Sequence, residues 1–281
     1  MRGLVSILFG LLLLAGAPHA YAQQGAEVPF PAALRGDAFR LESAILGRGF
    51  DIYVRLPSDY DPVGPAYPVV YLLDGDSLFP ILAANHLFLT YDEGLPEAVV
   101  VGIAYGGFEA SVNRRGLDFQ SPDEGLAAEQ ADAERFHTFL TDELLPMIEG
   151  RFNVDPDRRV LFGQSRGGNL VLYSAVAHPD DFQGRIASNP SLTPGMGSIT
   201  GSAARASRDD LKVAVTSGER DRPDLRTEAA FWVETWSGRD ADQRPWQVRL
   251  IPIAGGTHAA NAPDAYRAGM LWLFAQAEQG D

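Results

Sequence analysis

The sequence predicts a single domain of the α/β class, in which a mostly parallel central sheet carries helices on both faces. Apolar runs rich in β-branched residues alternate along the chain with longer segments that have apolar residues every three or four positions. Several of the short runs are apolar at nearly every position, which is typical of parallel strands covered on both faces. Residues 23–281 contain no repeat, low-complexity tract or charged linker, so we expect one domain.

The expected strands are short and bounded by turn residues. The first, DIYVRL, alternates polar and apolar positions, whereas PVVYLL and AVVVGIA are almost wholly apolar. Four more runs of the same kind follow them. In chain order the expected strands are residues 51–56, 68–73, 98–104, 159–162, 185–187, 211–216 and 248–253.

The longest expected helix covers residues 129–149. Its apolar side chains fall at the spacing of one buried helical stripe, made by Phe136, Phe139, Leu140, Leu144, Leu145 and Ile148. Further helices are expected at residues 169–176, 227–236 and 263–277. Strands and helices in this order favour parallel strands joined by crossover helices.

The first 22 residues predict a secretory signal peptide. Arg2 precedes an apolar run at residues 4–17, and Ala20-Tyr21-Ala22 has the Ala-x-Ala pattern of a cleavage site. The run is shorter than the roughly 20 apolar residues that a membrane-spanning helix needs. We therefore expect cleavage after Ala22, a mature domain of residues 23–281 without stable membrane insertion, and a periplasmic or secreted location.

Composition excludes several classes of protein. The formal charge of −14 argues against nucleic acid or an anionic membrane as a partner. Without cysteine there is no disulfide, thiolate metal site or cysteine nucleophile. Lys212 is the only lysine, and its neighbours do not form a phosphate-binding loop or a Ser-x-x-Lys motif. We expect no cofactor and no metal, and the oligomeric state stays open.

Chemically active residues follow four of the expected strands. These segments are Asp74-Gly75-Asp76-Ser77, the turn that carries Ser165, Gly218-Glu219-Arg220-Asp221, and Gly255-Gly256-Thr257-His258. In open α/β sheets, ligands bind at the carboxyl ends of the strands. We therefore expect a hydroxyl, a carboxylate, an imidazole and backbone N–H donors to meet at one edge of the sheet.

The turn around Ser165 fits the G-x-S-x-G nucleophile elbow, with a strand before it and a helix after it. Glycines at 163 and 167 remove Cβ atoms that would collide in so tight a turn. The start of the following helix directs N–H groups toward developing negative charge. A plain tight turn is the alternative, but the rest of the chain supplies partners for a nucleophile.

A serine hydroxyl needs a base within hydrogen-bond reach. Of the five histidines, only His258 follows a strand in a glycine-rich loop, after both the serine and an acid. Serine, acid and histidine therefore follow one another along the chain in the order expected of an α/β sheet with a nucleophile elbow. His137 and His178 are expected to cap or pack.

The imidazole needs an acceptor on its other nitrogen, which fixes its tautomer. The loop GERDRPD offers Glu219, Asp221 and Asp224, of which Asp221 is preferred and Glu219 comes second. For the oxyanion hole we expect two backbone N–H groups, that of Arg166 directly after the serine and that of Asp76 after an earlier strand.

The chain resembles the esterase family of α/β-hydrolases that includes esterase D, bacterial siderophore esterases and mycolyltransferases. The resemblance runs from about Ser43 to the C-terminus, over PVVYLLDGDSLF, RFHTFLTDELLPMIEGRFNVDPDRRVLFGQSRGG, HPDDFQGRIASNPSL and GGTHAANAPDAY. It implies an α/β-hydrolase fold, with Ser165 as nucleophile, His258 as base and the N–H of Asp76 as an oxyanion donor. The resemblance is loosest at the acid, because some siderophore esterases of this family work with little help from one.

The resemblance also implies substrate contacts. The segment NRRGLDFQSP is similar to an arginine-rich segment of the family, which places Arg114 or Arg115 near the mouth of the site. A ferric catecholate siderophore is strongly anionic, so Arg114, Arg115 and Arg166 are candidate contacts for one. Apart from the resemblance, His86 is expected in a helix or loop near the edge of the sheet, which makes it a further candidate substrate contact.

The expected activity is hydrolysis of a small-molecule carboxylic ester in two steps, through an acyl-enzyme on Ser165. A siderophore trilactone is the narrower expectation. One alternative is acyl transfer to an alcohol or sugar by the same three residues. Another is a non-catalytic binding protein on the same fold, which the presence of all three partners disfavours.

Overall fold

The computed structural model describes residues 34–201 and 203–275, so the predicted signal peptide lies outside the described residues. One eight-stranded sheet has the order β1-β2-β4-β3-β5-β6-β7-β8. The strands are β1 (Gly36–Ser43), β2 (Arg48–Arg55), β3 (Tyr67–Leu72), β4 (Val99–Ala104), β5 (Val154–Gln164), β6 (Gly184–Ser188), β7 (Leu211–Gly218) and β8 (Trp246–Ile253). β2 pairs antiparallel with β1 and with β4, and every other pair is parallel. The predicted mostly parallel sheet is confirmed.

The principal helices are α1 (Gly75–Glu93), α5 (Arg166–Ala177), α7 (Pro223–Ser237) and α8 (Ala262–Phe274). Shorter ones are α2 (Arg115–Asp118), η2 (Ala128–Gln130), α3 (Ala133–Phe139), η3 (Leu140–Leu144), α4 (Leu145–Arg151), η4 (Pro179–Asp181) and α6 (Met196–Thr200). Within the described ranges, no helix is both long and apolar enough to cross a bilayer.

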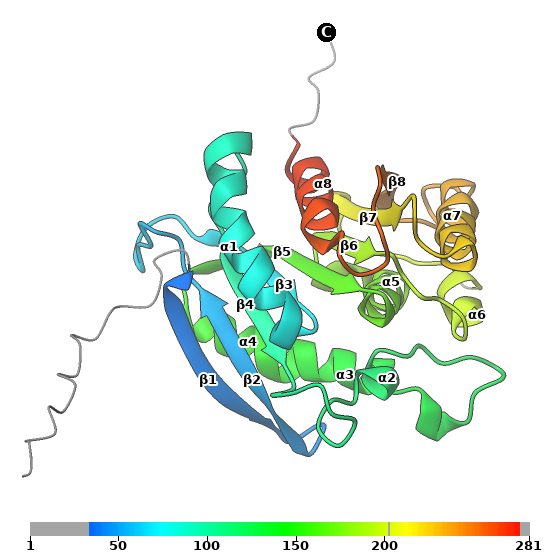
Figure 1. Cartoon of the computed structure of the whole chain (residues 1–281), viewed down its shortest axis with the longest axis horizontal. Coiled ribbons are helices and arrows are strands. Elements are labelled where there is room, and N and C mark those ends of the chain that lie inside the picture. Colours follow the sequence, from blue (N-terminus) through cyan, green and yellow to red (C-terminus); the bar gives the residue numbers. More distant parts are fainter. Residues whose placement is uncertain (1–33, 202, 276–281) are drawn as a thin grey trace, which may run out of the picture. The chain divides into compact units, whose positions relative to one another are not determined.

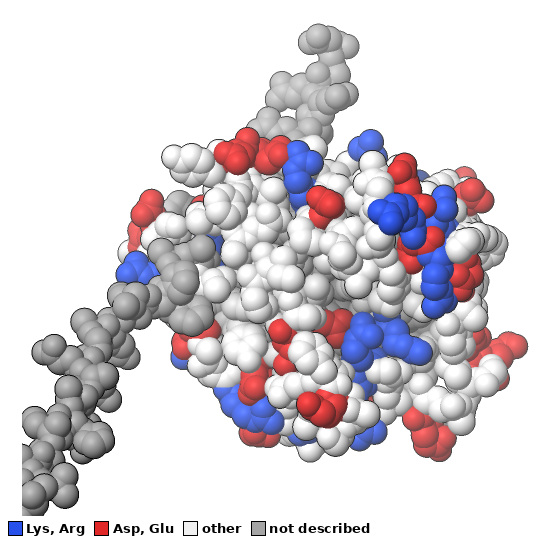
Figure 2. Space-filling view, in the orientation of Figure 1, with Lys and Arg blue, Asp and Glu red and all other residues white. Residues whose placement is uncertain are grey.

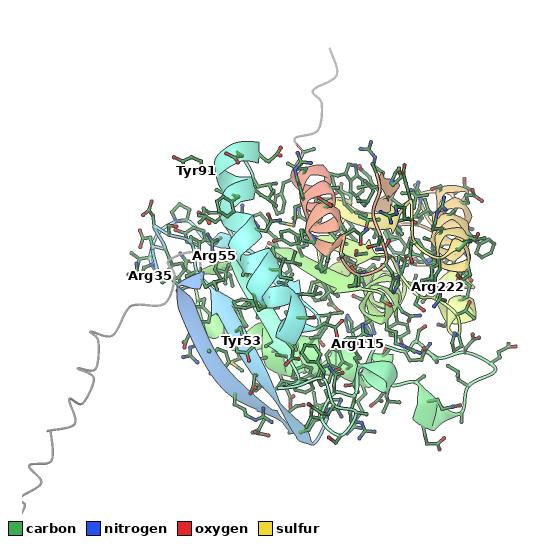
Figure 3. All side chains as sticks on the ribbon, in the orientation of Figure 1. Arg35, Tyr53, Arg55, Tyr91, Arg115 and Arg222 are labelled. Atoms are coloured by element: carbon green, nitrogen blue, oxygen red, sulfur yellow. The ribbon has the colours of Figure 1, made fainter. Side chains whose placement is uncertain are left out.

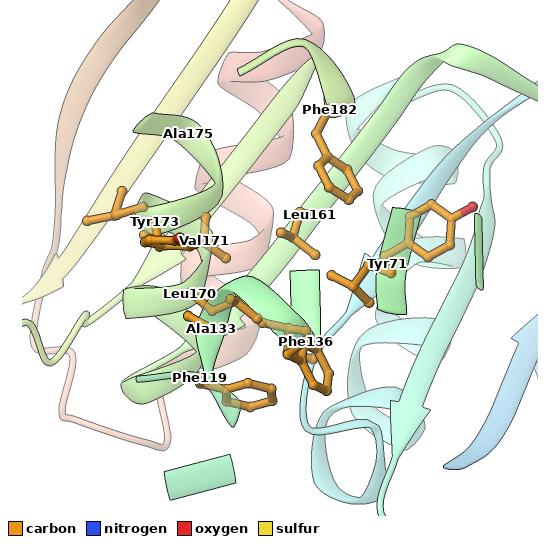
Figure 4. Packing of buried hydrophobic residues seen from close by; sticks show 14 of the residues in the cluster. Tyr71, Phe119, Ala133, Phe136, Leu161, Leu170, Val171, Tyr173, Ala175 and Phe182 are labelled. Carbon is orange, nitrogen blue, oxygen red and sulfur yellow. The ribbon is translucent and has the colours of Figure 1, made fainter. Parts of the chain in front are cut away.

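Helices cover both faces of the sheet, as predicted. Figure 1 shows α1 lying along β3 and β4, and α8 beside β6 and β7. These two helices enclose one apolar cluster with the side chains on their face of the sheet, such as Phe162 and Tyr266. On the other face, α3, α4, α5 and α7 pack on a larger cluster, part of which Figure 4 shows around Phe136, Leu161 and Leu170. The two cores pack against both faces of the sheet and so hold the carboxyl ends of its strands in place.

The sequence pattern does not predict β1 or α1. β1 is an edge strand in which exposed and half-buried residues alternate, so it lacks the apolar run of a central strand. The apolar residues of α1 do not form one stripe, because Leu78 and Leu82 are buried while Ile81 and Phe88 are exposed.

The expected helix at residues 129–149 is less regular than its apolar spacing suggests. Its first residues form the 3₁₀ turn η2, and its middle, η3, is a π-helical segment between α3 and α4. Pro146 stands at the start of α4 and has no backbone N–H to continue the α-helical ladder. The buried stripe itself is as predicted.

Candidate active site

Ser165 occupies a strained turn between β5 and α5. Its φ of 59° and ψ of −115° lie in a region that residues with a side chain rarely adopt. A Cβ on Gly163 would lie 2.3 Å from the carbonyl oxygen of Gly167, so the turn requires glycine at 163. The N–H of Ser165 donates to the carbonyl oxygen of Ser188 at 2.8 Å, which ties the turn to the end of β6. Ser165 lines a cavity at this edge of the sheet.

The structure brings Ser165, His258 and Asp221 together from the ends of β5, β8 and β7. His258 Nε2 lies 2.9 Å from Ser165 Oγ, and His258 Nδ1 lies 2.9 Å from Asp221 Oδ2. The Asp221 side chain is 1% exposed, and its Oδ1 also accepts the N–H of Arg222 at 2.7 Å. Because a carboxylate only accepts, Nδ1 of the imidazole donates to it. That tautomer leaves Nε2 free to accept the hydroxyl proton.

The other two carboxylates of the acid loop do not contact the imidazole. Glu219 is exposed and accepts the N–H of Gly255 at 3.1 Å. Asp224 is exposed and pairs with Arg222 at 2.6 Å. Of the three acids that the sequence offers, Asp221 alone has the geometry of an imidazole partner.

Two helix starts present backbone N–H groups near the nucleophile turn, since Arg166 directly follows Ser165 and Asp76 lines the same cavity as Ser165. Arg166 is the first residue of α5, and Asp76 is the second residue of α1. N–H groups in the first turn of a helix have no intrahelical acceptor, and in the described part of the chain neither of these two donates to a protein group. The Asp76 carboxylate accepts the N–H groups of Tyr105 and Gly106 at 2.7 and 3.0 Å, which holds the start of α1 in place.

The cavity at Ser165 has a volume of about 630 Å³. Its wall is mainly apolar and includes Leu78, Ile81 and Phe108. The lining residues beyond these are Asp74, Asp76, Ser77, Asn113, Arg115, Gln164, Ser165, His258, Ala259, Ala260, Ala262 and Pro263. A cavity of this size accommodates a small organic ester.

Arg115 lines this cavity, but its guanidinium is already bound within the protein. Its Nε and one Nη donate to the two oxygens of Asp74 at 2.7 and 2.9 Å, and the same Nη donates to the carbonyl oxygen of Gln164 at 3.2 Å. Figure 3 shows Arg115 between α2 and the start of α1. Burial raises the pKa of Asp74, and the hydrogen bonds from Arg115 oppose that rise. Arg115 therefore fixes the loop before α1 to the end of β5.

Arg114 and the side chain of Arg166 face a second cavity, of about 460 Å³. Arg166 donates to Gln120 Oε1 at 3.0 Å, and within the described ranges neither arginine pairs with a carboxylate. Figure 2 shows basic side chains gathered over the region of α2 and α5. Glu129 also lines this cavity, so two arginines against one carboxylate leave its lining net positive in a chain with a formal charge of −14.

His86 is not a substrate contact, and that prediction is wrong. The ring is fully buried between α1 and α8, with Nδ1 at 2.9 Å from the hydroxyl of Tyr266 and Nε2 at 3.2 Å from the carbonyl oxygen of Pro96. Burial lowers the pKa of His86 to about 4, so the ring stays neutral. A helix that the sequence pattern does not reveal carries this residue into the core.

His137, His178 and Asp181 form the one group of metal-ligand type in the described ranges. The two imidazole rings stack at 4.2 Å with an angle of 11° between them, so their in-plane lone pairs do not converge on one ion. His137 Nε2 contacts the Ser174 hydroxyl, and His178 Nε2 contacts a carboxylate oxygen of Glu134. The stacking is the packing role expected of both histidines.

Two polar residues beside the site have no individual signal in the sequence. Gln164 precedes the serine inside the elbow, and Asn189 follows β6; both are buried and contact the histidine loop. Asn189 also has a φ of 41°, which asparagine adopts more readily than most residues. It lies two residues after the expected strand at residues 185–187, a position that does not single it out from other loop residues.

The strand order, with a serine elbow after β5, a carboxylate after β7 and a histidine after β8, defines an α/β-hydrolase fold. A family model described as "Putative esterase" matches residues 43–252. The chain belongs to this family.

Individual proteins that are similar to this chain are also named as esterases. The ferri-bacillibactin esterase BesA of Bacillus subtilis is 36% identical over 191 residues, which are 63% of this chain and 62% of that protein. The siderophore triacetylfusarinine C esterase of Aspergillus fumigatus is 29% identical over 129 residues, or 44% of each chain. The chain thus spans less than two thirds of the length of these curated relatives. The crystal structure of the BES protein from Bacillus cereus superposes with a TM-score of 0.72 at 22% identity, over 84% of this chain and 95% of that one, which supports the fold.

Proposed function

We propose that this protein hydrolyses carboxylic esters, with Ser165 as nucleophile, His258 as general base and Asp221 as the acid that orients the base. The observation that carries the proposal is the 2.9 Å contact between Ser165 Oγ and His258 Nε2, at a strained turn that opens into a cavity. A base at this distance can take the hydroxyl proton as the bond to carbon forms.

The reaction proceeds in two steps. Ser165 Oγ attacks the ester carbonyl while its proton passes to His258 Nε2, and the tetrahedral intermediate then expels the alcohol with that proton. Water repeats the sequence on the acyl-enzyme and releases the carboxylic acid. The buried Asp221 carboxylate stabilises the imidazolium that forms in each step.

The negative charge on the carbonyl oxygen is held by the backbone N–H groups of Arg166 and Asp76. Their positions at two helix starts favour this role, because such groups are preorganised and add the helix dipole. Each donor is expected to lower the barrier by about 3 kcal/mol.

For the substrate we propose a siderophore ester. Two relatives are named for such esters, a ferri-bacillibactin esterase and a triacetylfusarinine C esterase. The arginines at 114 and 166 give the site a positive side that suits an anionic substrate, while the 630 Å³ cavity takes the scissile ester.

We further propose that residues 1–22 are removed as a signal peptide and that the mature protein acts in the periplasm or outside the cell. The support is the basic, apolar and Ala-x-Ala pattern of that segment. The mass of the exported protein tests this, since a mature chain that still begins at Met1 contradicts it.

The proposed activity is tested on the purified protein with a fluorophosphonate probe and a panel of esters. We expect the probe to modify Ser165, as located by peptide mass, and catecholate trilactones to be cleaved with a higher kcat/KM than short acyl or feruloyl esters.

Equal or better turnover of the short esters would contradict the siderophore proposal but leave the esterase proposal standing. Ester products formed with added alcohol or sugar, in place of free acid, would favour the acyltransferase alternative. A protein that neither reacts with the probe nor cleaves any ester would be a binding protein.

A further inference from the structure

The backbone of His258 is anchored separately from its ring. Its carbonyl oxygen accepts one hydrogen bond from Gln164 Nε2 and another, of 2.8 Å, from Asn189 Nδ2. We call this pair of side chains, Gln164 and Asn189, the amide clamp. The two come from the ends of neighbouring strands, β5 and β6.

Asn189 joins the histidine loop to the acid loop. Its Nδ2, which has two hydrogens, lies within hydrogen-bond distance of three acceptors: the carbonyl oxygens of Thr257 and His258 at 3.1 and 2.8 Å and Asn261 Oδ1 at 2.6 Å. Its Oδ1 accepts the N–H of Gly218 at 2.7 Å, at the end of the strand that leads into the acid loop. Asn189 is 2% exposed, so water does not compete for these hydrogen bonds.

Gln164 joins the histidine loop to the nucleophile turn. Its Oε1 accepts the hydroxyl of Ser188 at 2.6 Å, and the carbonyl oxygen of the same Ser188 accepts the N–H of Ser165. The backbone of the serine and the backbone of His258 are therefore connected through two residues. This connection is independent of the contact between the imidazole and Asp221.

The peptide of His258 is a separate determinant of where the ring lies, because Asp221 and Ser165 contact only the ring nitrogens. Its side chain is 37% exposed, and Ala259 and Ala260 beside it offer only methyl groups for packing. Hydrogen bonding by the ring nitrogens fixes the ring orientation, but the position of the ring follows the position of its peptide. An error of about 1 Å in such a position can lower a rate about 100-fold.

We propose that Gln164 and Asn189 are positioning residues, which hold the His258 peptide so that Nε2 stays within hydrogen-bond reach of Ser165 Oγ. The inference rests on the proposed catalytic roles of Ser165 and His258. Neither clamp residue touches the reacting atoms through its amide group, so each acts through the histidine.

Two variants test the clamp by independent routes. Asn189→Gly removes the side-chain contacts to four partner atoms and keeps a backbone that tolerates the φ of 41°. Gln164→Met removes the other amide at similar volume. For each we expect kcat on a p-nitrophenyl ester to fall about 10- to 100-fold, with KM within about twofold of the wild type.

Asn153→Ala is the matched control. Asn153 Nδ2 also donates to two backbone carbonyl oxygens, those of Asp61 and Gly64, but it lies before β5, at the opposite end of that strand from the elbow. Its loss should lower the unfolding temperature and leave kcat unchanged. A similar drop in kcat for this control and for the folded clamp variants would mean that the clamp is merely structural.

A double-mutant cycle with His258→Ala gives the sharpest readout. If the clamp acts through the histidine, Asn189→Gly should have almost no further effect on the residual kcat of the His258→Ala protein. An equal fold-loss in both backgrounds, or folded clamp variants with wild-type kcat, would overturn the proposal. If instead Ser165→Ala retained full activity, the proposed function would fail, and that outcome is separate from failure of the clamp.

Discussion

Replacing Ser165 by alanine is expected to reduce kcat on a short p-nitrophenyl ester by on the order of 10⁵- to 10⁶-fold, equivalent to about 7–8 kcal/mol of barrier. The substitution removes the hydroxyl that lies 2.9 Å from His258 Nε2 and with it the acyl-enzyme route. Alanine at φ 59° is strained to a similar degree as serine, so the turn should persist. The residual rate would come from water attacking an ester held by the backbone donors.

The measurement is steady-state turnover by the purified variant, with the unfolding temperature recorded alongside. Ser198→Ala is a suitable control, since its hydroxyl bonds to the carbonyl oxygen of Gly195 in the first turn of α6 and takes no part in the site. The control should keep wild-type turnover. Unchanged turnover by a folded Ser165→Ala protein would end the esterase proposal.

Replacing Asp221 by asparagine is expected to lower kcat about 10⁴-fold. An amide at this position can present its NH₂ to Nδ1, which would stabilise the tautomer whose Nε2 carries a proton and cannot accept one from serine. The neutral amide would also leave no charge to stabilise the imidazolium. Glu219→Gln is the paired control and should change kcat by less than about twofold, because Glu219 is exposed and its carboxylate accepts the N–H of Gly255 instead of contacting the imidazole.

The two acid variants discriminate between the carboxylates of one loop. The opposite ranking, with the larger loss at Glu219, would require the loop to rearrange when substrate binds. Equal and small losses for both would mean that the histidine works without an acid. Either result would remove Asp221 from the mechanism and leave Ser165 and His258 in it.

The central features of the fold and site are predictable because they are local in the sequence. Buried parallel strands appear as apolar runs, and the segment that follows each run lies at the active edge of the sheet. Ser165, Asp221 and His258 each occupy such a segment, so a meeting of serine, acid and histidine could be expected, although the pattern left the acid open between Asp221 and Glu219.

The remaining features depend on tertiary contacts that one sequence does not display. His86 lies on α1, whose apolar residues face both solvent and core, so periodicity reveals neither the helix nor the burial of the ring. Arg115 binds Asp74 from a segment 41 positions away, which turns an expected substrate contact into a structural one. The amide clamp is of the same kind, because a buried amide becomes informative only when its acceptors are known.

The clamp holds the His258 loop by its peptide carbonyl groups, with no requirement for particular side chains at the two positions after the histidine. Ala259 and Ala260 line the cavity with nothing larger than methyl groups, and both are exposed. Bulkier or charged residues can therefore be introduced there to reshape which esters enter, while the proton acceptor keeps its place. The arrangement therefore allows the size and charge of the cavity wall to change at these two positions while the contacts of the clamp to the His258 peptide stay in place.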